Sequence, residues 1–234
     1  MAQGTSSVGG SPAAGGAVPG VWITLEGGDG VGKTTQSTLL EEWLVTQGRT
    51  VVRTREPGGT EVGNLIRDIV LHHRGEIAPR AEALLYAADR AHHISTVVRP
   101  AIARGDVVIQ DRYLDSSVAY QGAGRALDPG EVRELSLWAS DHALPDVTVL
   151  LDLDPALART RLDADDKPFD RLEAEREEFH VRVREHFLAL AASEPERFLV
   201  LDAARPAGDL ASDIRDRLQP LLTVAPGRGV GGRD

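Results

Sequence analysis

The chain has 234 residues, of which 41% are hydrophobic and 26% are charged, so it can form one domain with a substantial core. Its net charge of -10 argues against a nucleic-acid-binding protein, but not against a small anionic ligand held by a few arginines. No apolar run approaches the ~18 residues of a membrane helix, so we expect no membrane partner. The absence of cysteine excludes disulfides and thiolate metal sites, and we expect a cytoplasmic protein.

Strand-like and helix-like segments alternate along most of the chain. Residues 1–19 are rich in Gly, Ala and Ser and predict a disordered extension, and residues 223–234 predict a flexible tail. Between them, residues 20–222 form the predicted domain. The predicted strands are 21–25, 50–53, 106–110, 146–151 and 197–201, and the predicted helices are 33–46, 61–73, 79–103, 155–162, 172–192 and 207–222.

This alternation predicts an α/β fold built from βαβ units. Five short apolar strands separated by helices favour a doubly wound, five-stranded parallel sheet flanked by helices on both faces. Right-handed crossovers then place a ligand at the carboxyl ends of the strands. Functional residues are therefore expected where the strands end.

Residues 27–34, GGDGVGKT, satisfy the pattern G-x-x-x-x-G-K-S/T between a predicted strand and a predicted helix. The glycines let successive N–H groups face one anion, and the helix adds the positive end of its dipole. Lys33 would bridge the β- and γ-phosphates of ATP, and the Thr34 hydroxyl would bind Mg²⁺. The predicted ATP site comprises Gly27, Gly28, Asp29, Gly30, Val31, Gly32, Lys33, Thr34 and Thr35. A P-loop alone does not specify a reaction, because GTPases, motor ATPases and kinases share it.

The third predicted strand ends in Asp111-Arg112-Tyr113, beside the P-loop strand if the sheet is doubly wound. An aspartate here can hold the metal through water, and an arginine can reach a transferring phosphoryl group. The same pair also suits a helix-capping aspartate with an exposed arginine. Taken alone, it leaves both interpretations open.

Four further blocks resemble the thymidylate kinase family. Residues 111–122, DRYLDSSVAYQG, resemble its DR-Y/F-x-x-S-x-x-A-Y-Q-G signature, and residues 54–60, TREPGGT, resemble its bacterial segment of that sequence. LLYAADR at 84–90 and DRLE at 170–173 are similar to its base-binding helix and the end of its lid. With the P-loop, these blocks stand in family order across residues 21–222. The chain is therefore identified as a member of this family of P-loop nucleoside monophosphate kinases.

The resemblance implies a P-loop kinase fold with a small lid at about residues 161–172, a homodimer, and a reaction in which ATP and dTMP give ADP and dTDP with Mg²⁺. It implies that Tyr86 stacks on thymine and that Arg90 and Gln121 hydrogen-bond its edge. It also implies that Ser117 and Tyr120 form the wall around the sugar, where close packing disfavours a 2′-hydroxyl.

The resemblance also implies which residues bind the acceptor phosphate. Arg67 and Arg112 match a clamp on that phosphate, for which the planar guanidinium fork is suited. Asp29 matches a carboxylate near the 3′-hydroxyl and the metal. The predicted dTMP site comprises Asp29, Glu56, Arg67, Tyr86, Arg90, Arg112, Ser117, Tyr120 and Gln121, and the predicted metal ligands are Thr34 and Asp111.

The lid departs from the family pattern. The variable P-loop positions carry no basic residue, so the resemblance points to members that use lid arginines, yet the segment 163–171, DADDKPFDR, is acidic. Of Arg159, Arg161, Lys167 and Arg171, we select Arg161 and Arg171, with Lys167 a weaker substitute. The alternative is a solvated acidic loop in which Arg171 caps the next helix. The predicted catalytic residues are Lys33, Arg112, Asp29, Arg161 and Arg171.

Two other functions are weighed against a dTMP kinase. One is a P-loop kinase for a different deoxynucleotide or nucleoside. The other is a nucleotide-binding regulatory homologue with weak catalysis, which the acidic lid suggests. A GTPase is excluded because the chain has no guanine-reading N-K-x-D segment.

Overall fold

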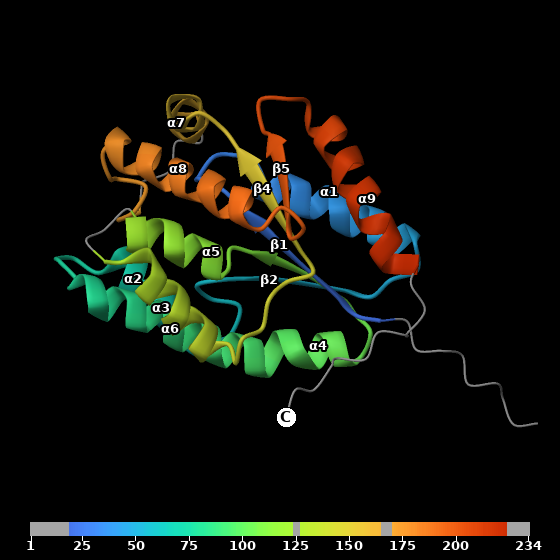
Figure 1. Cartoon of the computed structure of the whole chain (residues 1–234), viewed down its shortest axis with the longest axis horizontal. Coiled ribbons are helices and arrows are strands. Elements are labelled where there is room, and N and C mark those ends of the chain that lie inside the picture. Colours follow the sequence, from blue (N-terminus) through green and yellow to red (C-terminus); the bar gives the residue numbers. More distant parts are fainter. Residues whose placement is uncertain (1–18, 124–126, 165–169, 224–234) are drawn as a thin grey trace, which may run out of the picture.

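The computed structural model describes residues 19–123, 127–164 and 170–223 (Figure 1). The predicted N-terminal extension, the C-terminal tail and Lys167 of the lid therefore lie almost entirely outside the described residues. One five-stranded sheet forms the centre of the molecule. Its strands are β1 (Val21–Glu26), β2 (Val51–Arg55), β3 (Val107–Asp111), β4 (Val147–Asp152) and β5 (Phe198–Asp202).

The strands are all parallel and lie in the order β2-β3-β1-β4-β5. The chain leaves the central β1, fills β2 and β3 on one side, and later fills β4 and β5 on the other. This confirms the predicted doubly wound sheet. Because β1 and β3 are neighbours, the P-loop after β1 and Asp111 at the end of β3 meet at the same edge of the sheet.

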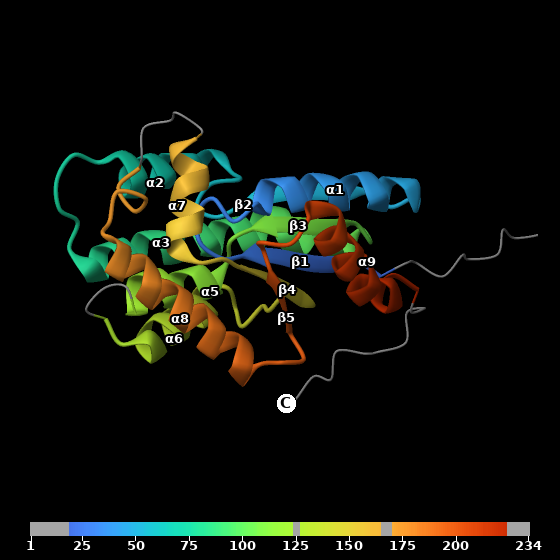
Figure 2. The same cartoon turned by 90° about the horizontal axis from the view of Figure 1, so that it is seen from above.

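Helices cover both faces of the sheet (Figure 2). They are α1 (Lys33–Thr46), α2 (Glu61–His72), α3 (Pro79–His93), α4 (Arg99–Ala103), α5 (Leu114–Ser117), α6 (Pro129–Ala139), α7 (Pro155–Asp163), α8 (Glu177–Ser193) and α9 (Ala207–Thr223). Two π-helical segments, 94–98 and 118–123, continue α3 into α4 and extend α5. No helix among these described residues is long and apolar enough to span a membrane.

Alternating side chains of β1 enter different cores. Ile23 and Leu25 pack with Leu40 of α1 and Ile214 of α9. Trp22 points to the opposite face, where residues of α4, α5 and α6 cover it. A third cluster lies between α8 and the α2–α3 pair. Both faces of the sheet are therefore buried, as its almost continuous apolar strands predict.

The structure differs from the predicted elements in two segments. The helix predicted to begin at residue 172 begins at Glu177, because Asp170 Oδ1 accepts from the amides of Leu172 (2.8 Å) and Glu173 (2.9 Å) and closes a turn there. The helices between Leu114 and Ala139 were not predicted. Asp128 marks the start of α6, since its carboxylate accepts from the Glu131 amide at 3.0 Å.

Candidate active site

The P-loop turns sharply between β1 and α1. Gly27, Gly30 and Gly32 have φ values of 128°, 74° and 98°, a region that residues with a Cβ rarely adopt. The buried Lys33 side chain lies across this loop and donates to the Gly28 carbonyl at 2.5 Å. Burial lowers the pKa of the Lys33 ammonium, and the nearby Arg112 charge adds to this effect.

A cavity of about 710 Å³ runs from the P-loop to α3. Lys33, Thr34 and Thr35 line one end, and Tyr86, Arg90 and Gln121 line the other. The structure thus brings all of the predicted dTMP residues and most of the predicted ATP residues to one cavity, whereas Gly27, Gly28 and Val31 line a smaller neighbouring pocket. The remaining predicted residues that line the larger cavity are Asp29, Gly30, Gly32, Glu56, Arg67, Asp111, Arg112, Ser117, Tyr120 and Arg161.

Arg112 links the P-loop to the end of β3. Its Nη2 donates to Asp29 Oδ1 at 2.5 Å, and its Nη1 donates to the Gly27 carbonyl and to Ser116 Oγ, each at 3.0 Å. Tyr120 donates its hydroxyl to the other Asp29 oxygen at 3.2 Å. Burial alone would raise the pKa of the Asp29 carboxyl, but the Arg112 and Lys33 charges hold it down, at about 2.

The Arg112 backbone has φ 64°, an unusual conformation for a side chain of this size. Neighbouring groups fix it: its amide donates to the Leu25 carbonyl, and its carbonyl accepts from Gln110 Nε2, each at 3.0 Å. The next amide, of Tyr113, donates to Glu26 Oε1 at 2.7 Å. The strained turn is therefore held from β1 and β3 together, which favours a functional role for its position.

Glu26 is a fully buried carboxylate below this turn. It also accepts from Ser116 Oγ at 2.6 Å, and that hydroxyl in turn accepts from Arg112. Burial, helped by the nearby Asp115 charge, raises the pKa of Glu26 to about 7. Ser116 was not among the predicted site residues, although the sequence DRYLDSS places it directly beside them.

Arg90 lies at the other end of the cavity and is only 1% exposed. Its Nε donates to Glu56 (3.0 Å), its Nη1 to Ser136 (2.9 Å) and its Nη2 to Ser117 (3.0 Å). His93 Nδ1 lies 2.9 Å from the second Glu56 oxygen. The guanidinium is therefore fixed in the pocket, with one face toward the ring of Tyr113.

Arg67 approaches the same cavity from α2. Its Nη1 donates to the Pro57 carbonyl at 3.0 Å, and burial lowers its pKa, helped by the neighbouring Arg55. Arg67 and Arg112 thus reach the cavity from two different elements, α2 and the end of β3.

The residues predicted to bind Mg²⁺ fit a site of that kind. Asp111 Oδ1 is buried and has no hydrogen-bond partner, and Thr34 lines the same cavity. Mg²⁺ is commonly held by one or two carboxylates together with substrate phosphates, so a full protein cage is not required. In the described part of the chain, no cluster of three or more His, Cys, Asp or Glu side chains forms such a cage.

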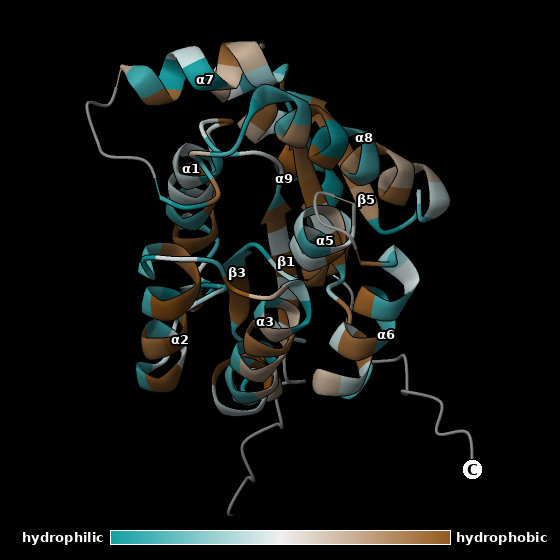
Figure 3. Ribbon diagram, turned by 90° about the vertical axis from the view of Figure 1, so that its left-hand side faces the viewer, coloured by the Kyte–Doolittle hydropathy of each residue, from teal (hydrophilic) through white to brown (hydrophobic). Residues whose placement is uncertain are grey.

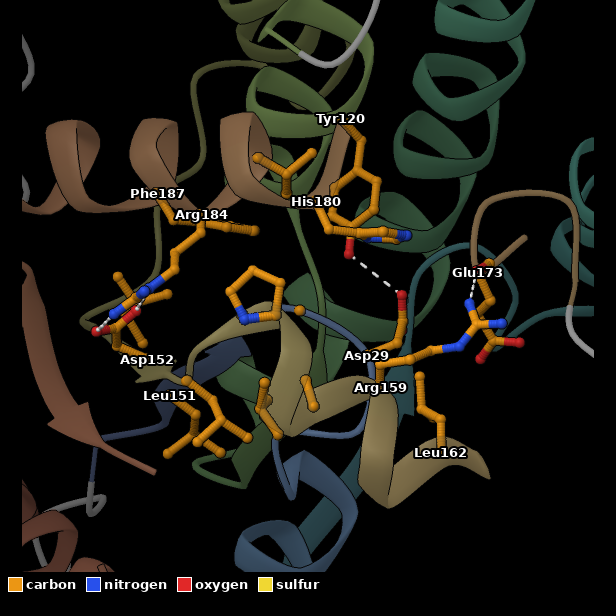
Figure 4. A pocket seen from close by; sticks show the side chains of 18 residues that line it. Asp29, Tyr120, Leu151, Asp152, Arg159, Leu162, Glu173, His180, Arg184 and Phe187 are labelled. Carbon is orange, nitrogen blue, oxygen red and sulfur yellow. Dashed lines mark hydrogen bonds and ion pairs between the residues drawn. The ribbon is translucent and has the colours of Figure 1, made fainter. Parts of the chain in front are cut away.

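The lid arginines point in different directions. Arg161 lines the cavity and donates to the Ala203 carbonyl at 3.1 Å. Arg171 instead donates to the Val70 carbonyl at 2.9 Å and pairs with Glu82, on the acceptor side. Arg159 donates to the Glu173 carbonyl at 3.2 Å, beside a smaller pocket of about 50 Å³ between the P-loop, α7 and α8 (Figure 4).

Comparison with known proteins identifies the family and the fold. The family model described as thymidylate kinase matches residues 25–214. The chain belongs to the thymidylate kinase family. The thymidylate kinase of Leifsonia xyli subsp. xyli is 71% identical over 200 residues, which are 86% of this chain and 95% of that protein. That of Cutibacterium acnes is 53% identical over 204 residues, 87% of this chain and 98% of that protein.

A solved structure agrees with this family. The crystal structure of thymidylate kinase from Ehrlichia chaffeensis has a TM-score of 0.69 and 31% sequence identity, covering 86% of this chain and 99% of that chain. These findings confirm the predicted family, the five-stranded α/β fold and the enzyme class, a nucleoside monophosphate kinase.

Proposed function

We propose that this kinase transfers the γ-phosphoryl group of ATP directly to the 5′-phosphate of dTMP within the 710 Å³ cavity. The observation that supports this is the continuity of the cavity, which has P-loop residues at one end and Tyr86, Arg90 and Gln121 at the other. Arg112 lies between the two ends. Such an arrangement suits two nucleotides that meet at their phosphates.

The chain needs no nucleophile of its own. An oxygen of the acceptor phosphate attacks the γ-phosphorus, and the protein positions the groups and neutralises charge. Lys33 binds the β- and γ-phosphates, while Arg112 and Arg67 hold the acceptor phosphate as bidentate donors. Asp29 orients Arg112 through their ion pair and faces the sugar side of the cavity.

The acceptor base occupies the α3 end of the cavity. Tyr86 provides a flat, buried ring for stacking, and Arg90 and Gln121 read the edge of the base. Ser117 and Tyr120 form the wall beside the sugar. A base that leaves a buried donor unpaired costs ~1–3 kcal/mol, which gives the site its selectivity.

Mg²⁺ is the cofactor that suits Asp111 and Thr34. When bound, it neutralises charge on the ATP phosphates. Asp111 supplies a buried, unpaired carboxylate oxygen for it, directly or through water. Among the described lid cations, Arg161 is the one we assign to the transferring phosphoryl group, because it already lines the cavity.

The kinase acts as a homodimer through an apolar face on α2, α3 and α6. Val62, Leu65 and Ile69 follow one another at helical spacing on α2, and Leu65 is 63% exposed. Leu84 of α3 and Trp138 of α6 are also exposed, Trp138 at 77%, and α3 packs against both α2 and α6. Figure 3 shows these three helices side by side. An exposed apolar face of this kind suits a second copy of the chain.

The dimer is tested by sedimentation of Leu65→Glu. A monomeric variant with an unchanged thermal melt is the expected result. A wild-type protein that sediments as a monomer would contradict the assignment.

The function is tested with purified enzyme, ATP and a panel of deoxynucleoside monophosphates. We expect dTMP to be phosphorylated well above dUMP, dCMP and dGMP, and activity to require Mg²⁺. Preference for another monophosphate would identify a different kinase, and normal binding of ATP and dTMP with background turnover would identify a regulatory homologue. We propose that the kinase acts in the cytoplasm, which fractionation of the native cells tests.

A further inference from the structure

A buried acidic side chain lies directly behind the base end of the cavity. Glu82 is 1% exposed and stands one helical turn before Tyr86 and two turns before Arg90, on the same face of α3. Glu82 is not among the residues that the sequence predicts for the site. Its position on this face suggests that it serves the same ligand without lining the cavity itself.

Glu82 holds the amide group of Gln121. Gln121 Nε2 donates to Glu82 Oε1 at 3.1 Å, and both side chains are buried. A carboxylate accepts hydrogen bonds and has none to give, so the NH₂ end of Gln121 must face Glu82. The carbonyl Oε1 is then the end of the amide that is left to meet a ligand in the cavity, which Gln121 lines.

The other side of Glu82 is occupied as well. Arg171 pairs with Glu82 Oε2 and is itself anchored on the Val70 carbonyl. A guanidinium only donates, so this partner also requires an acceptor at position 82. Glu82 therefore lies between two donors, and each of them fixes it as an acceptor.

This arrangement has a direct consequence for base selection. Thymine and uracil carry N3–H, a donor, and O4, an acceptor, whereas cytosine carries N3 as an acceptor and an amino group in place of O4. An amide oxygen aimed at N3 accepts from thymine and repels cytosine. An amide NH₂ aimed at N3 would do the reverse.

We propose that Glu82 is a positioning residue for specificity: it fixes the Gln121 amide so that the site reads N3–H and rejects cytosine. This inference rests on the proposed function, which places Gln121 against the base edge. It adds a residue that does not touch the base but decides which hydrogen-bonding atom the base meets.

Glu82→Gln provides the test. Its carbonyl would accept from Arg171, so its NH₂ would donate to Gln121 Oε1 and turn the Gln121 amide around. We expect the ratio of kcat/KM for dTMP over dCMP to fall about tenfold or more. The ratio for dTMP over dUMP should stay unchanged, because both bases carry the same N3–H and O4. A general distortion of the pocket would not spare that second ratio.

The double variant Glu82→Gln with Gln121→Glu is the matched control. The new amide at position 82 donates to the new carboxylate at position 121, which again presents an acceptor to N3–H, so selectivity against dCMP should return. Thermal melts establish that each variant is folded, and the double variant tests the pairing even if Glu82→Gln alone fails to fold.

The outcomes separate this inference from the proposed function. A folded Glu82→Gln enzyme that keeps the wild-type dTMP over dCMP ratio would overturn the inference, as would a folded double variant without that selectivity. A wild-type enzyme that does not prefer dTMP and dUMP over dCMP would instead overturn the proposed reading of the base.

Discussion

Nη2 of Arg112 lies 2.5 Å from Oδ1 of Asp29, so the end of β3 and the P-loop are joined by a partly buried ion pair at the middle of the cavity. The same guanidinium also donates to Gly27, Ser116 and Tyr120. One side chain thus fixes the relative position of the donor loop and the acceptor strand. Its planar fork is what makes four simultaneous contacts possible.

Arg112→Lys should therefore lower kcat strongly, by about 100-fold or more, while the protein stays folded. A lysine keeps the charge but cannot donate to the P-loop and Ser116 from one rigid plane. Steady-state kinetics with dTMP and ATP measure this. Arg205→Lys, at an exposed ion pair with Asp213 on the far C-terminal helix, is the control and should leave kcat unchanged. Equal kinetics for the two variants would contradict the proposed role.

Much of this site follows from the sequence because its residues belong to short, contiguous motifs. The P-loop and the segment 111–121 each bring several functional side chains to one strand end, so a parallel sheet is enough to bring them together. Glu82 and Ser136 were not predicted because their partners are distant in the sequence. Glu82 accepts from Gln121, 39 residues away, and Ser136 accepts from Arg90, 46 residues away. Such pairings depend on helix packing, which no local pattern encodes.

The lid shows the same limit. Arg161 and Arg171 were both predicted from charge and position, yet Arg161 lines the cavity and donates to Ala203, whereas Arg171 pairs with Glu82 of α3. Arg171 follows the turn at Asp170 and pairs with the Glu82 carboxylate of α3. Arg161 lies on α7 and lines the cavity together with P-loop residues. The sequence shows which lid residues are basic, but the direction in which each side chain points depends on partners far away in the sequence.

The two lid arginines should consequently give different kinetic defects. Arg161→Ala should lower kcat with little change in the KM for dTMP, because its charge acts on the transferring phosphoryl group. Arg171→Ala should mainly raise the KM for dTMP, because it loosens Glu82 behind the base. Initial rates at varied dTMP and saturating ATP separate the two. A kcat defect confined to Arg171→Ala would reverse the assignment.

The P-loop also depends on close contact with α7. A Cβ at Gly30 would lie 2.7 Å from the Ala158 carbonyl oxygen and 3.0 Å from Leu162 Cγ, and φ there is 74°. Gly30→Ala should destabilise the fold by more than the ~1–2 kcal/mol of left-handed backbone strain alone, and it should raise the KM for ATP. Thermal melts and ATP titrations measure both effects.

Gly48→Ala is the matched control for this strain. Gly48 has φ 72°, but a Cβ added there would meet nothing within 4 Å, and the residue lies after α1, away from the cavity. It should show the strain without the clash and leave the KM for ATP unchanged. Equal losses of stability in the two variants would mean that α7 does not press on the loop.

The buried carboxylate of Asp89 predicts an unusual dependence of stability on pH. Burial, helped by the Glu56 charge, raises the pKa of Asp89 from 3.8 to about 7. The folded protein therefore binds this proton more tightly than the unfolded chain does. Protonation of Asp89 thus adds to the free energy of unfolding, and this contribution is fully present below about pH 4. It is lost progressively as the pH rises to about 7, and none of it remains above that value.

Asp89→Asn mimics the protonated form at every pH. Its Tm should match the wild type near pH 4, exceed it increasingly up to pH 7, and stay higher by several degrees at pH 8. Asp216→Asn, at an exposed position of α9, corrects for the loss of one negative charge from a chain of net charge -10. Melts of the three proteins at pH 5 and pH 8 decide the question. A variant that is less stable than the wild type at pH 8 would mean that the Asp89 carboxylate is favourably bound, most directly by the Gly58 amide 3.3 Å away.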